Sequence, residues 1–441
     1  MARFILLSVG LFFFLFSFTC LKEKEKRATV RSFFFFLVNA LFFGLSFLLP
    51  ISFQKIFSSA IVILFFFFLI LSVIPFEKKC SIRIIYPIQK VDERDVIFSR
   101  TDLIPGTETY KEYYERHPEF KEIDDKIRKS PPLLQPGSTL YHALTSELAQ
   151  SEFDFLEAQL KLVNGQVNSD KIYLEAEEAT HWIKKLTSYL GAKLVGIAQP
   201  DKAFYYSHVG RGPEPYGQKI ELNHSFAIAF AVEMSFNQIS QAPSPPVVVE
   251  TGKQYVEAAR ISIILANYIR SLGYQARAHI AGSNYQAILP AIAYQAGLGE
   301  LGRLGILITP QYGPRVRLGL VTTNLPLIPD KPITFGVQNF CEKCLKCAIN
   351  CPSQAIDNGV KKNVRGVEKW PLKVEKCYQF WRKIGTDCAV CIYLCPYSKP
   401  RNLVHNSIRT VIKYSPLLRR ISVEADNLFY GKNLLLIKLK K

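Results

Sequence analysis

The sequence predicts a mixed α/β (α+β) chain that is preceded by three transmembrane helices and followed by a small cysteine-rich domain. Three observations predict this class. Charge-free, phenylalanine-rich stretches fill the first 77 residues, helical and strand patterns alternate up to about residue 335, and eight of the ten cysteines lie between Cys341 and Cys395. A chain of 441 residues is long enough for one large domain or two smaller ones, with appendages.

Three apolar segments near the N-terminus carry no charged residue: Phe4–Cys20, Phe33–Ile51 and Ile56–Phe76. Each approaches or exceeds the roughly 18–20 residues that cross a hydrocarbon core of about 30 Å. Buried core helices are the alternative, but successive runs without a polar face cannot be solvated in water. The segments therefore predict a three-span membrane anchor over residues 1–77, with the lipid bilayer as a partner.

The basic residues that flank these segments predict an orientation. Five follow the first segment: Lys22, Lys24, Lys26, Arg27 and Arg31. Three more, Lys78, Lys79 and Arg83, follow the third segment, on the same side because two spans separate the two sets. The positive-inside rule then places the N-terminus outside and the large C-terminal part in the cytoplasm, as a multi-pass protein of the cell membrane. A cleaved signal peptide would instead place the first basic loop outside, and no twin-arginine pair precedes the first segment.

The net charge of +18 does not by itself identify a partner. The basic residues are scattered, with small concentrations beside the apolar segments and at the C-terminus. This distribution favours proximity to a membrane surface, and no nucleic-acid partner is expected.

Residues 78–170 are polar and turn-rich and are expected to wrap the following domain as irregular structure and short helices. The patterns after them predict helices at Glu175–Leu190, Tyr255–Leu272 and Gln286–Ala296, and strands at Lys193–Ile197, Ser225–Val232, Ile306–Ile308 and Val316–Thr323. Gly273 and Gly297 end the second and third helices, and Pro290 is expected to kink or interrupt the third. An α/β domain over 171–335, a cysteine-rich domain over 336–400 and an extension over 401–441 that packs on the catalytic unit complete the expected organisation.

The cysteines form two runs. The first is Cys341-x2-Cys344-x2-Cys347-x3-Cys351-Pro352, the spacing of bacterial two-cluster ferredoxins, in which the fourth cysteine binds the other cluster. The second is Cys377-x10-Cys388-x2-Cys391-x3-Cys395-Pro396. The runs predict a two-cluster ferredoxin-like domain with two 4Fe–4S clusters. The expected ligand sets are Cys341, Cys344, Cys347 and Cys395 for one cluster, and Cys351, Cys377, Cys388 and Cys391 for the other.

Four-cysteine zinc sites are the alternative for these runs. Structural zinc favours two separated Cys-x2-Cys pairs, whereas the first run is compact and ends in proline, so iron–sulfur clusters are favoured. The remaining two cysteines, Cys20 and Cys80, lie at the boundaries of the apolar segments and are read as incidental small apolar residues.

A glycine pattern, Gly297-Leu-Gly299-Glu-Leu-Gly302, matches G-x-G-x-x-G. A dinucleotide site requires this pattern to follow a strand and open a helix, whereas here it follows a predicted helix. The pattern therefore predicts a tight helix-to-strand turn. A Walker A motif and an H-E-x-x-H motif are both absent from the sequence.

Five further motifs lie between about residue 95 and the first cysteine run: Tyr113-Tyr-x2-His117-Pro-Glu-x4-Asp124-Asp125-x2-Arg128, Leu190-Gly-Ala-x-Leu-Val-Gly-Ile-Ala, Ala296-Gly-Leu-Gly-Glu-Leu-Gly-Arg303, Ile308-Thr-Pro-x-Tyr-Gly-Pro-x-Val-Arg317-Leu, and the segment from Thr323 to Cys351. In these motifs, the sequence from about residue 95 to the end resembles the corrinoid-dependent reductive dehalogenases. The displaced Cys377, with Trp381 between it and Cys388, also fits the family. The better-known respiratory members are exported by the Tat route and use a separate anchor protein, whereas this chain carries its own apolar segments.

The resemblance implies that residues 171–335 bind a base-off corrinoid (cobalamin) without a protein ligand to cobalt, and the sequence indeed lacks a D-x-H-x-x-G motif. It implies an oxidoreductase that replaces halide by hydrogen in an organohalide, using two electrons and one proton. The electrons would come from a ferredoxin, a flavodoxin or a quinol-linked donor. By motif position, Tyr255 would be the proton donor, Arg317 its basic partner and Asn284 a pocket amide, while Thr251, on the same helical approach, would bind the cofactor.

The residue types suit these roles, because a guanidinium that stabilises a phenolate makes tyrosine a better acid. Without the resemblance, Tyr255 would be read as a core tyrosine at a helix start and Arg317 as a surface arginine at a strand end. Two other functions stay open. An epoxyqueuosine-reductase-like corrinoid enzyme would want a carboxylate near the position of Asn284, and a membrane-bound 4Fe–4S electron carrier would have no catalysis of its own.

Overall fold

The computed structural model describes residues 1–73, 80–282 and 285–432, and the chain forms two compact units. The anchor unit comprises the described residues of segments 1–81, 335–346 and 399–441, and the core unit comprises those of 82–334 and 347–398. The cysteine-rich segment predicted over 336–400 therefore contributes to both units. The predicted domain boundaries were placed at sequence motifs, whereas the two compact units are defined by which residues pack together in the fold.

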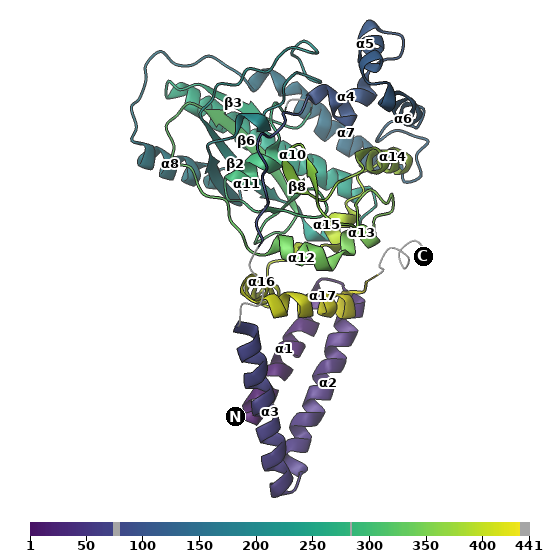
Figure 1. Ribbon diagram of the computed structural model, residues 1–441, viewed down its shortest axis with the longest axis vertical. Coiled ribbons are helices and arrows are strands. Elements are labelled where there is room, and N and C mark those ends of the chain that lie inside the picture. The colour runs from purple at the N-terminus through teal and green to yellow at the C-terminus, as the bar shows by residue number, and fades with distance from the viewer. Residues whose placement is uncertain (74–79, 283–284, 433–441) are drawn as a thin grey trace. The chain divides into compact units, whose positions relative to one another are not determined.

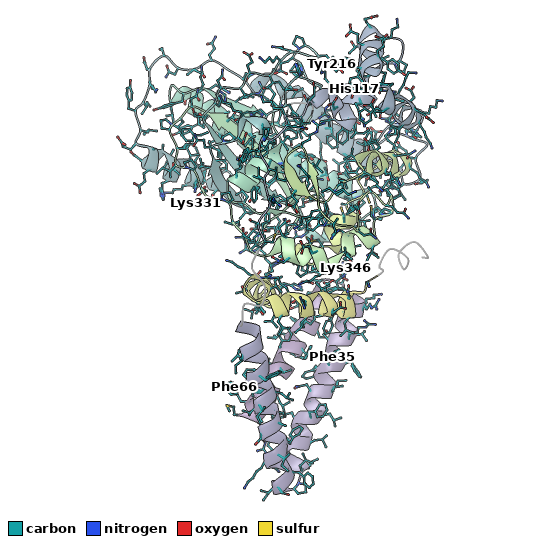
Figure 2. All side chains as sticks on the ribbon, viewed as in Figure 1. Phe35, Phe66, His117, Tyr216, Lys331 and Lys346 are labelled. Carbon is teal, nitrogen blue, oxygen red and sulfur yellow. The ribbon has the colours of Figure 1, made fainter. Side chains whose placement is uncertain are left out.

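Three long helices form one part of the anchor unit: α1 (Ala2–Lys22), α2 (Lys26–Leu48) and α3 (Ile51–Val73) (Figure 1). Among the described residues, α1 and α2 are long and apolar enough to cross a membrane, and the apolar stretch assigned to α3 by the same criterion is shorter, Ile51–Phe67. Aromatic side chains such as Phe35 and Phe66 project from these helices (Figure 2). The last residues of the predicted segment Ile56–Phe76 lie outside the described residues.

The C-terminal helices α16 (Leu403–Tyr414) and α17 (Pro416–Tyr430) belong to the anchor unit, as does α12 (Val337–Cys344). Their apolar side chains join those of α1 and α2 in one cluster, which includes Phe16, Cys20, Ala28, Val404, Phe429 and Tyr430. The nearly buried His405 lies 3.1 Å from the carboxylate of Glu23. The described part of the extension from residue 401 thus packs with the apolar helices α1 and α2 of its own unit. The expectation that the extension packs on the catalytic unit stays a prediction.

A four-stranded antiparallel sheet is the centre of the core unit, in the order β1–β2–β6–β3. Its strands are β1 (Leu194–Ala198), β2 (Phe226–Glu233), β6 (Val316–Thr323) and β3 (Ala276–His279). The first three lie within a residue of the predicted strands, and β3 was not predicted. The antiparallel sheet with helices on its faces confirms the mixed α/β class.

Helices cover both faces of this sheet. On one face, Ile228 and Val321 pack in a core with side chains of α7 (Ala143–Ala158), α8 (Ala176–Tyr189) and α10 (Pro246–Ser271). On the other face, Ala229 and Leu320 pack against α11 (Leu289–Gln295). Because side chains alternate along a strand, β2 and β6 supply both cores, which explains their nearly continuous apolar sequences.

Two helices differ from the predictions at their first residues. Helix α10 begins at Pro246, well before Tyr255, because proline is well suited to a first turn that lacks hydrogen-bonded N–H groups. Helix α11 begins at Leu289, so Pro290 lies in its first turn and does not kink it. Gly273 and Gly297 follow the two helices with φ of +85° and +74°, as predicted for helix ends.

The G-x-G-x-x-G pattern forms a helix-to-strand turn, as predicted. It connects α11 to the short antiparallel pair β4 (Glu300–Leu301) and β5 (Leu307–Ile308). A Cβ atom on Gly299 would lie 2.2 Å from the carbonyl oxygen of Ile308, so only glycine permits this approach. The glycines serve close backbone packing in this turn.

Residues 82–170 are more helical than expected, with α4 (Ile97–Asp102), α5 (Glu108–Arg116), α6 (Pro118–Arg128) and α7. The buried Arg100 links this segment to the second cysteine run, because its guanidinium contacts Asp124 at 3.5 Å and Glu375 at 2.9 Å. The remaining elements are α9 (Phe236–Ile239), α13 (Lys346–Ile349), β7 (Lys362–Val364), β8 (Val367–Lys369), α14 (Val374–Ile384), α15 (Val390–Leu394) and the 3-10 turns Glu93–Asp95, Leu160–Leu162, Lys202–Phe204 and Pro396–Ser398.

Candidate functional site

Arg317 of β6 contacts two side chains of α10. One terminal N–H group donates a hydrogen bond to the phenol oxygen of Tyr255 at 3.3 Å, and the other donates to the hydroxyl of Thr251 at 2.7 Å. The guanidinium carbon also lies 4.7 Å from the centroid of the Tyr255 ring. Because residues four apart share one face of a helix, α10 presents both acceptors to the same guanidinium. The structure thus brings together three of the four residues assigned by motif position.

Asp387 is a further partner of Arg317 that the sequence did not identify. Its carboxylate oxygen lies 3.4 Å from the second terminal nitrogen of Arg317. Asp387 directly precedes Cys388, so one residue of the second cysteine run touches the arginine of the sheet. Only the fold brings these distant segments together, and no local sequence signal marks Asp387.

Burial and neighbouring charge act in opposite directions on the pKa values of Arg317 and Asp387. Burial alone would lower the pKa of Arg317, but the neighbouring Tyr255 and Asp387 raise that pKa overall, so the guanidinium stays protonated. Burial raises the pKa of Asp387, and the charge of Arg317 opposes that rise. Burial also raises the pKa of Tyr285 well above its usual value, with Tyr255 adding to the effect.

A cavity of about 230 Å³ opens beside this arginine. Tyr206, Tyr255, Tyr285 and Arg317 supply its polar groups, and most of its other lining side chains are apolar and come from residues 287–290, 306–307 and 314–318. No histidine is among the described residues that line it. Asn284, assigned as a pocket amide by resemblance, lies outside the described residues. The cavity is smaller than the ~300 Å³ of pockets for drug-sized ligands and suits a small organic molecule.

The second predicted ligand set lies together in the core unit. Burial raises the pKa of the Cys391 thiol well above its usual value, and the nearby Cys388, Cys377 and Cys351 raise it further. Burial is the largest cause that raises the pKa of Cys388 to about 12, and the nearby Cys377 and Cys351 raise it further. These mutual effects show that the four thiols lie near one another. Among the described residues, no group of three or more of them is arranged to hold a metal ion, so their assignment to one 4Fe–4S cluster stays a prediction from spacing.

The first predicted ligand set is divided between the two units. Cys341 and Cys344 lie on α12 in the anchor unit, and Cys347 and Cys395 lie in the core unit. This set therefore stays a prediction from spacing. No disulfide joins any two of the ten cysteines, all of which the structure describes.

Several buried polar atoms beside the site have no hydrogen-bond partner among the described residues. They include the Nε of Arg317, the hydroxyl of Thr386 and the hydroxyl of Tyr205. Since buried polar groups are normally hydrogen-bonded, such atoms suit a polar bound molecule. The amide-bearing rim of a corrinoid offers groups of this kind.

Comparison with known proteins also indicates iron–sulfur clusters and a corrinoid. Residues 340–399 match the family described as "4Fe-4S dicluster domain". The chain is 32% identical over 289 residues to the tetrachloroethene reductive dehalogenase of Sulfurospirillum multivorans, covering 58% of this chain and 57% of that protein. It is 32% identical over 358 residues to the corresponding enzyme of Dehalobacter restrictus, covering 67% and 63%. The chain thus spans about three fifths of the length of these relatives.

A solved reductive dehalogenase, whose structure suggests a mechanism for B12-dependent dehalogenation, superposes with a TM-score of 0.65. It is 25% identical and covers 81% of this chain and 50% of that chain. The match to the epoxyqueuosine reductase of Lactococcus garvieae is shorter, with 31% identity over 136 residues. Sequence and fold therefore favour the dehalogenases over the epoxyqueuosine reductases.

Proposed function

Because this chain is homologous to the reductive dehalogenases, we propose that it replaces halide by hydrogen in a small organohalide. The reaction consumes two electrons and one proton and releases a halide ion. The observation that supports it most directly is the contact between Arg317 and Tyr255 at the wall of a cavity of small-molecule size. The chain would accordingly be an oxidoreductase.

In this proposal Tyr255 donates the proton from its phenol oxygen. The N–H group of Arg317 then donates its hydrogen bond to the phenolate oxygen that remains. Thr251 and Asp387 fix the direction of the guanidinium through the bonds described above. A general acid placed in this way typically contributes about 10²–10⁴ in rate.

The cofactors proposed are two 4Fe–4S clusters and a base-off corrinoid. The match of residues 340–399 and the grouped thiols of Cys351, Cys377, Cys388 and Cys391 support the clusters. When bound, the corrinoid would supply a strongly reducing cobalt centre for cleaving the carbon–halogen bond. A corrinoid is larger than the cavity of about 230 Å³, so its ring would also occupy adjoining space, and the unpartnered atoms of Arg317, Thr386 and Tyr205 would be available to it.

The membrane arrangement proposed is a three-span anchor, with the N-terminus outside and the core unit in the cytoplasm. The two helices α1 and α2 and the shorter apolar stretch of α3 support it. The basic residues at the adjoining ends of α1 and α2, with Lys24 between the two helices, agree with the positive-inside rule. The bilayer, an organohalide and an electron donor of the ferredoxin, flavodoxin or quinol-linked type are the proposed partners.

The test is halide release by the anaerobically purified full chain, supplied with a corrinoid, a chemical reductant and a panel of haloaromatic and haloalkane compounds. Release of halide from at least one compound is expected. Protein that retains both clusters and the corrinoid but dehalogenates nothing would favour another corrinoid reductase. Protein that retains iron without cobalt would favour the electron carrier.

A further inference from the structure

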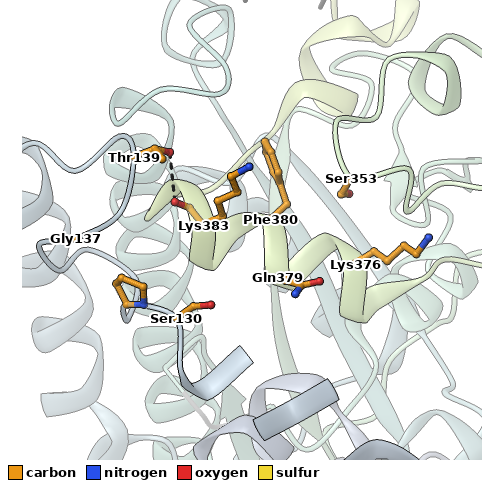
Figure 3. A pocket seen from close by; sticks show the side chains of 9 residues that line it. Ser130, Gly137, Thr139, Ser353, Lys376, Gln379, Phe380 and Lys383 are labelled. Atoms are coloured by element: carbon orange, nitrogen blue, oxygen red, sulfur yellow. Dashed lines mark hydrogen bonds between the residues drawn. The ribbon is translucent and has the colours of Figure 1, made fainter. Parts of the chain in front are cut away.

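A second hollow, of about 560 Å³, lies on the core unit at helix α14 (Figure 3). One wall is a face of α14 that presents Lys376, Gln379, Phe380 and Lys383, called here the α14 face. Their spacing of three, four and seven residues places all four on the same side of the helix. Ser353, from the first cysteine run, lines the hollow as well.

The wall opposite α14 is held in place by several hydrogen bonds. Arg382 donates to the carbonyl oxygens of Pro131 and Ser130 at 2.8 and 2.5 Å. The backbone N–H of Thr139 donates to the carbonyl oxygen of Lys383 at 3.1 Å. Because both walls are fixed in this way, the hollow is preformed and a partner would lose little free energy in ordering it.

The hollow adjoins two ligands of the second cluster set. The hydroxyl of Ser353 lies 3.4 Å from the sulfur of Cys351, and Lys376 directly precedes Cys377. Both cysteines are half-buried, as is Cys391, whereas Cys388 is buried. A molecule seated on the α14 face would therefore lie beside two partly exposed cysteines of this set.

The charge of the α14 face is positive and uncompensated. Lys376 and Lys383 are exposed, and neither forms an ion pair with any carboxylate among the described residues. The one acidic residue of α14, Glu375, is engaged by the buried Arg100 at 2.9 Å. Two lysines around an amide and an aromatic ring form the kind of mixed surface on which a charged protein docks, with electrostatic attraction speeding its approach.

We propose that the α14 face docks a small acidic one-electron carrier protein, which delivers electrons to the cluster of Cys351, Cys377, Cys388 and Cys391. This inference rests on the proposed function, because that reaction needs a supply of two electrons. In each docking event the carrier is oxidised by one electron and the cluster is reduced by one, with no bond made or broken. Two docking events supply one turnover.

The experiment compares three forms of the full, cluster-loaded chain in detergent. They are the unmodified chain, the double variant Lys376→Glu/Lys383→Glu, and a matched control, Lys185→Glu/Lys193→Glu, which makes the same charge change at exposed lysines of α8 and the loop after it. The probe is an acidic bacterial-type ferredoxin. Its dissociation constant is measured at low and high salt, and the bleaching of cluster absorbance is followed after mixing with the reduced ferredoxin.

The double variant at the α14 face is expected to weaken binding by about tenfold or more at low salt and to slow cluster reduction similarly. The control should bind like the unmodified chain, and added salt should abolish most of the difference. Reduction of all three forms by methyl viologen should match, which shows that the clusters are intact. Equal ferredoxin binding by the two variants would overturn the proposal, as would cluster reduction by a quinol in proteoliposomes without any by ferredoxin. Neither the binding measurement nor the cluster reduction involves an organohalide. A failure of this proposal can therefore be told apart from a failure of the proposed dehalogenation.

Discussion

The guanidinium of Arg317 lies 4.7 Å from the ring centroid of Tyr255 and donates a hydrogen bond to its phenol oxygen at 3.3 Å. The arginine therefore contacts both the π face and the phenol oxygen of Tyr255. The pair stands at a cavity wall, where a proton released from the phenol can reach a bound molecule.

The first prediction concerns the fork geometry of Arg317. Lysine keeps the charge but cannot donate to Tyr255 and Thr251 with two fixed nitrogens. Arg317→Lys should lower kcat by about 10- to 100-fold, which corresponds to losing one or two charged hydrogen bonds. Steady-state kinetics at several pH values would measure this, with Thr251→Ser as the conservative control that keeps a hydroxyl. Unchanged kcat in Arg317→Lys would show that charge alone is sufficient.

A second prediction concerns the ligands of the second cluster. Cys391→Ser should remove that cluster and lower the iron content from about eight to about four atoms per chain. The reason is that the spacing of the two runs assigns Cys391 to the same ligand set as Cys388, Cys377 and Cys351. Cys80→Ser is the control, since Cys80 is exposed and outside both runs. Iron analysis of anaerobically prepared protein would decide, and equal iron in both variants would remove Cys391 from the ligand set.

A third prediction concerns orientation in the membrane. Cys80 is an exposed thiol that follows the third apolar segment, and the proposed orientation places it in the cytoplasm. A membrane-impermeant maleimide should label it in inverted vesicles and leave it unlabelled in right-side-out vesicles. Labelling should vanish in Cys80→Ser. Labelling in right-side-out vesicles alone would reverse the proposed orientation.

A fourth prediction concerns pH and stability. Burial raises the pKa of Glu152 on α7 from 4.5 to about 7, with the charge of Glu250 adding to the rise and Lys253 opposing it. The folded chain therefore binds more protons than the unfolded chain between these pH values, and the contribution of Glu152 to stability is lost as pH rises through about 7.

Replacing Glu152 by Gln should remove this loss, because glutamine is neutral at every pH. The Tm of Glu152→Gln minus the Tm of the unmodified chain should therefore be more positive at a pH of about 8 than at a pH of about 5. Thermal unfolding followed by tryptophan fluorescence would measure it. An identical difference at both pH values would exclude an uncharged Glu152 in the folded state.

Local patterns in the sequence predicted most of the central sheet. Strand β6 was predicted residue for residue, because its apolar run is bounded by turn residues, whereas β3, only four residues long, gives too short a pattern to distinguish. The first residue of α10 was predicted too late, because Pro246 was not recognised as a helix start. Such boundaries depend on the first turn, where propensity is a weak guide.

The candidate site was predicted only in part. Spacing alone predicted the cysteine sets, whereas Tyr255 and Arg317 were assigned by resemblance, since an isolated tyrosine or arginine carries no signal of chemistry. Asp387 could not be foreseen, because its contact with Arg317 joins segments that are distant in the chain. The packing of the C-terminal helices with α1 and α2 was also missed, since an amphipathic face does not reveal which surface it will cover.

The most direct test of the proposed mechanism is the turnover of Tyr255→Phe, measured as halide released per chain under anaerobic conditions with a chemical reductant. The phenylalanine ring preserves packing and removes only the phenol that Arg317 contacts. Turnover should fall by about 10²–10⁴, while iron and cobalt contents stay those of the unmodified chain. Unchanged turnover with both metals retained would contradict the assignment of Tyr255 as the proton donor.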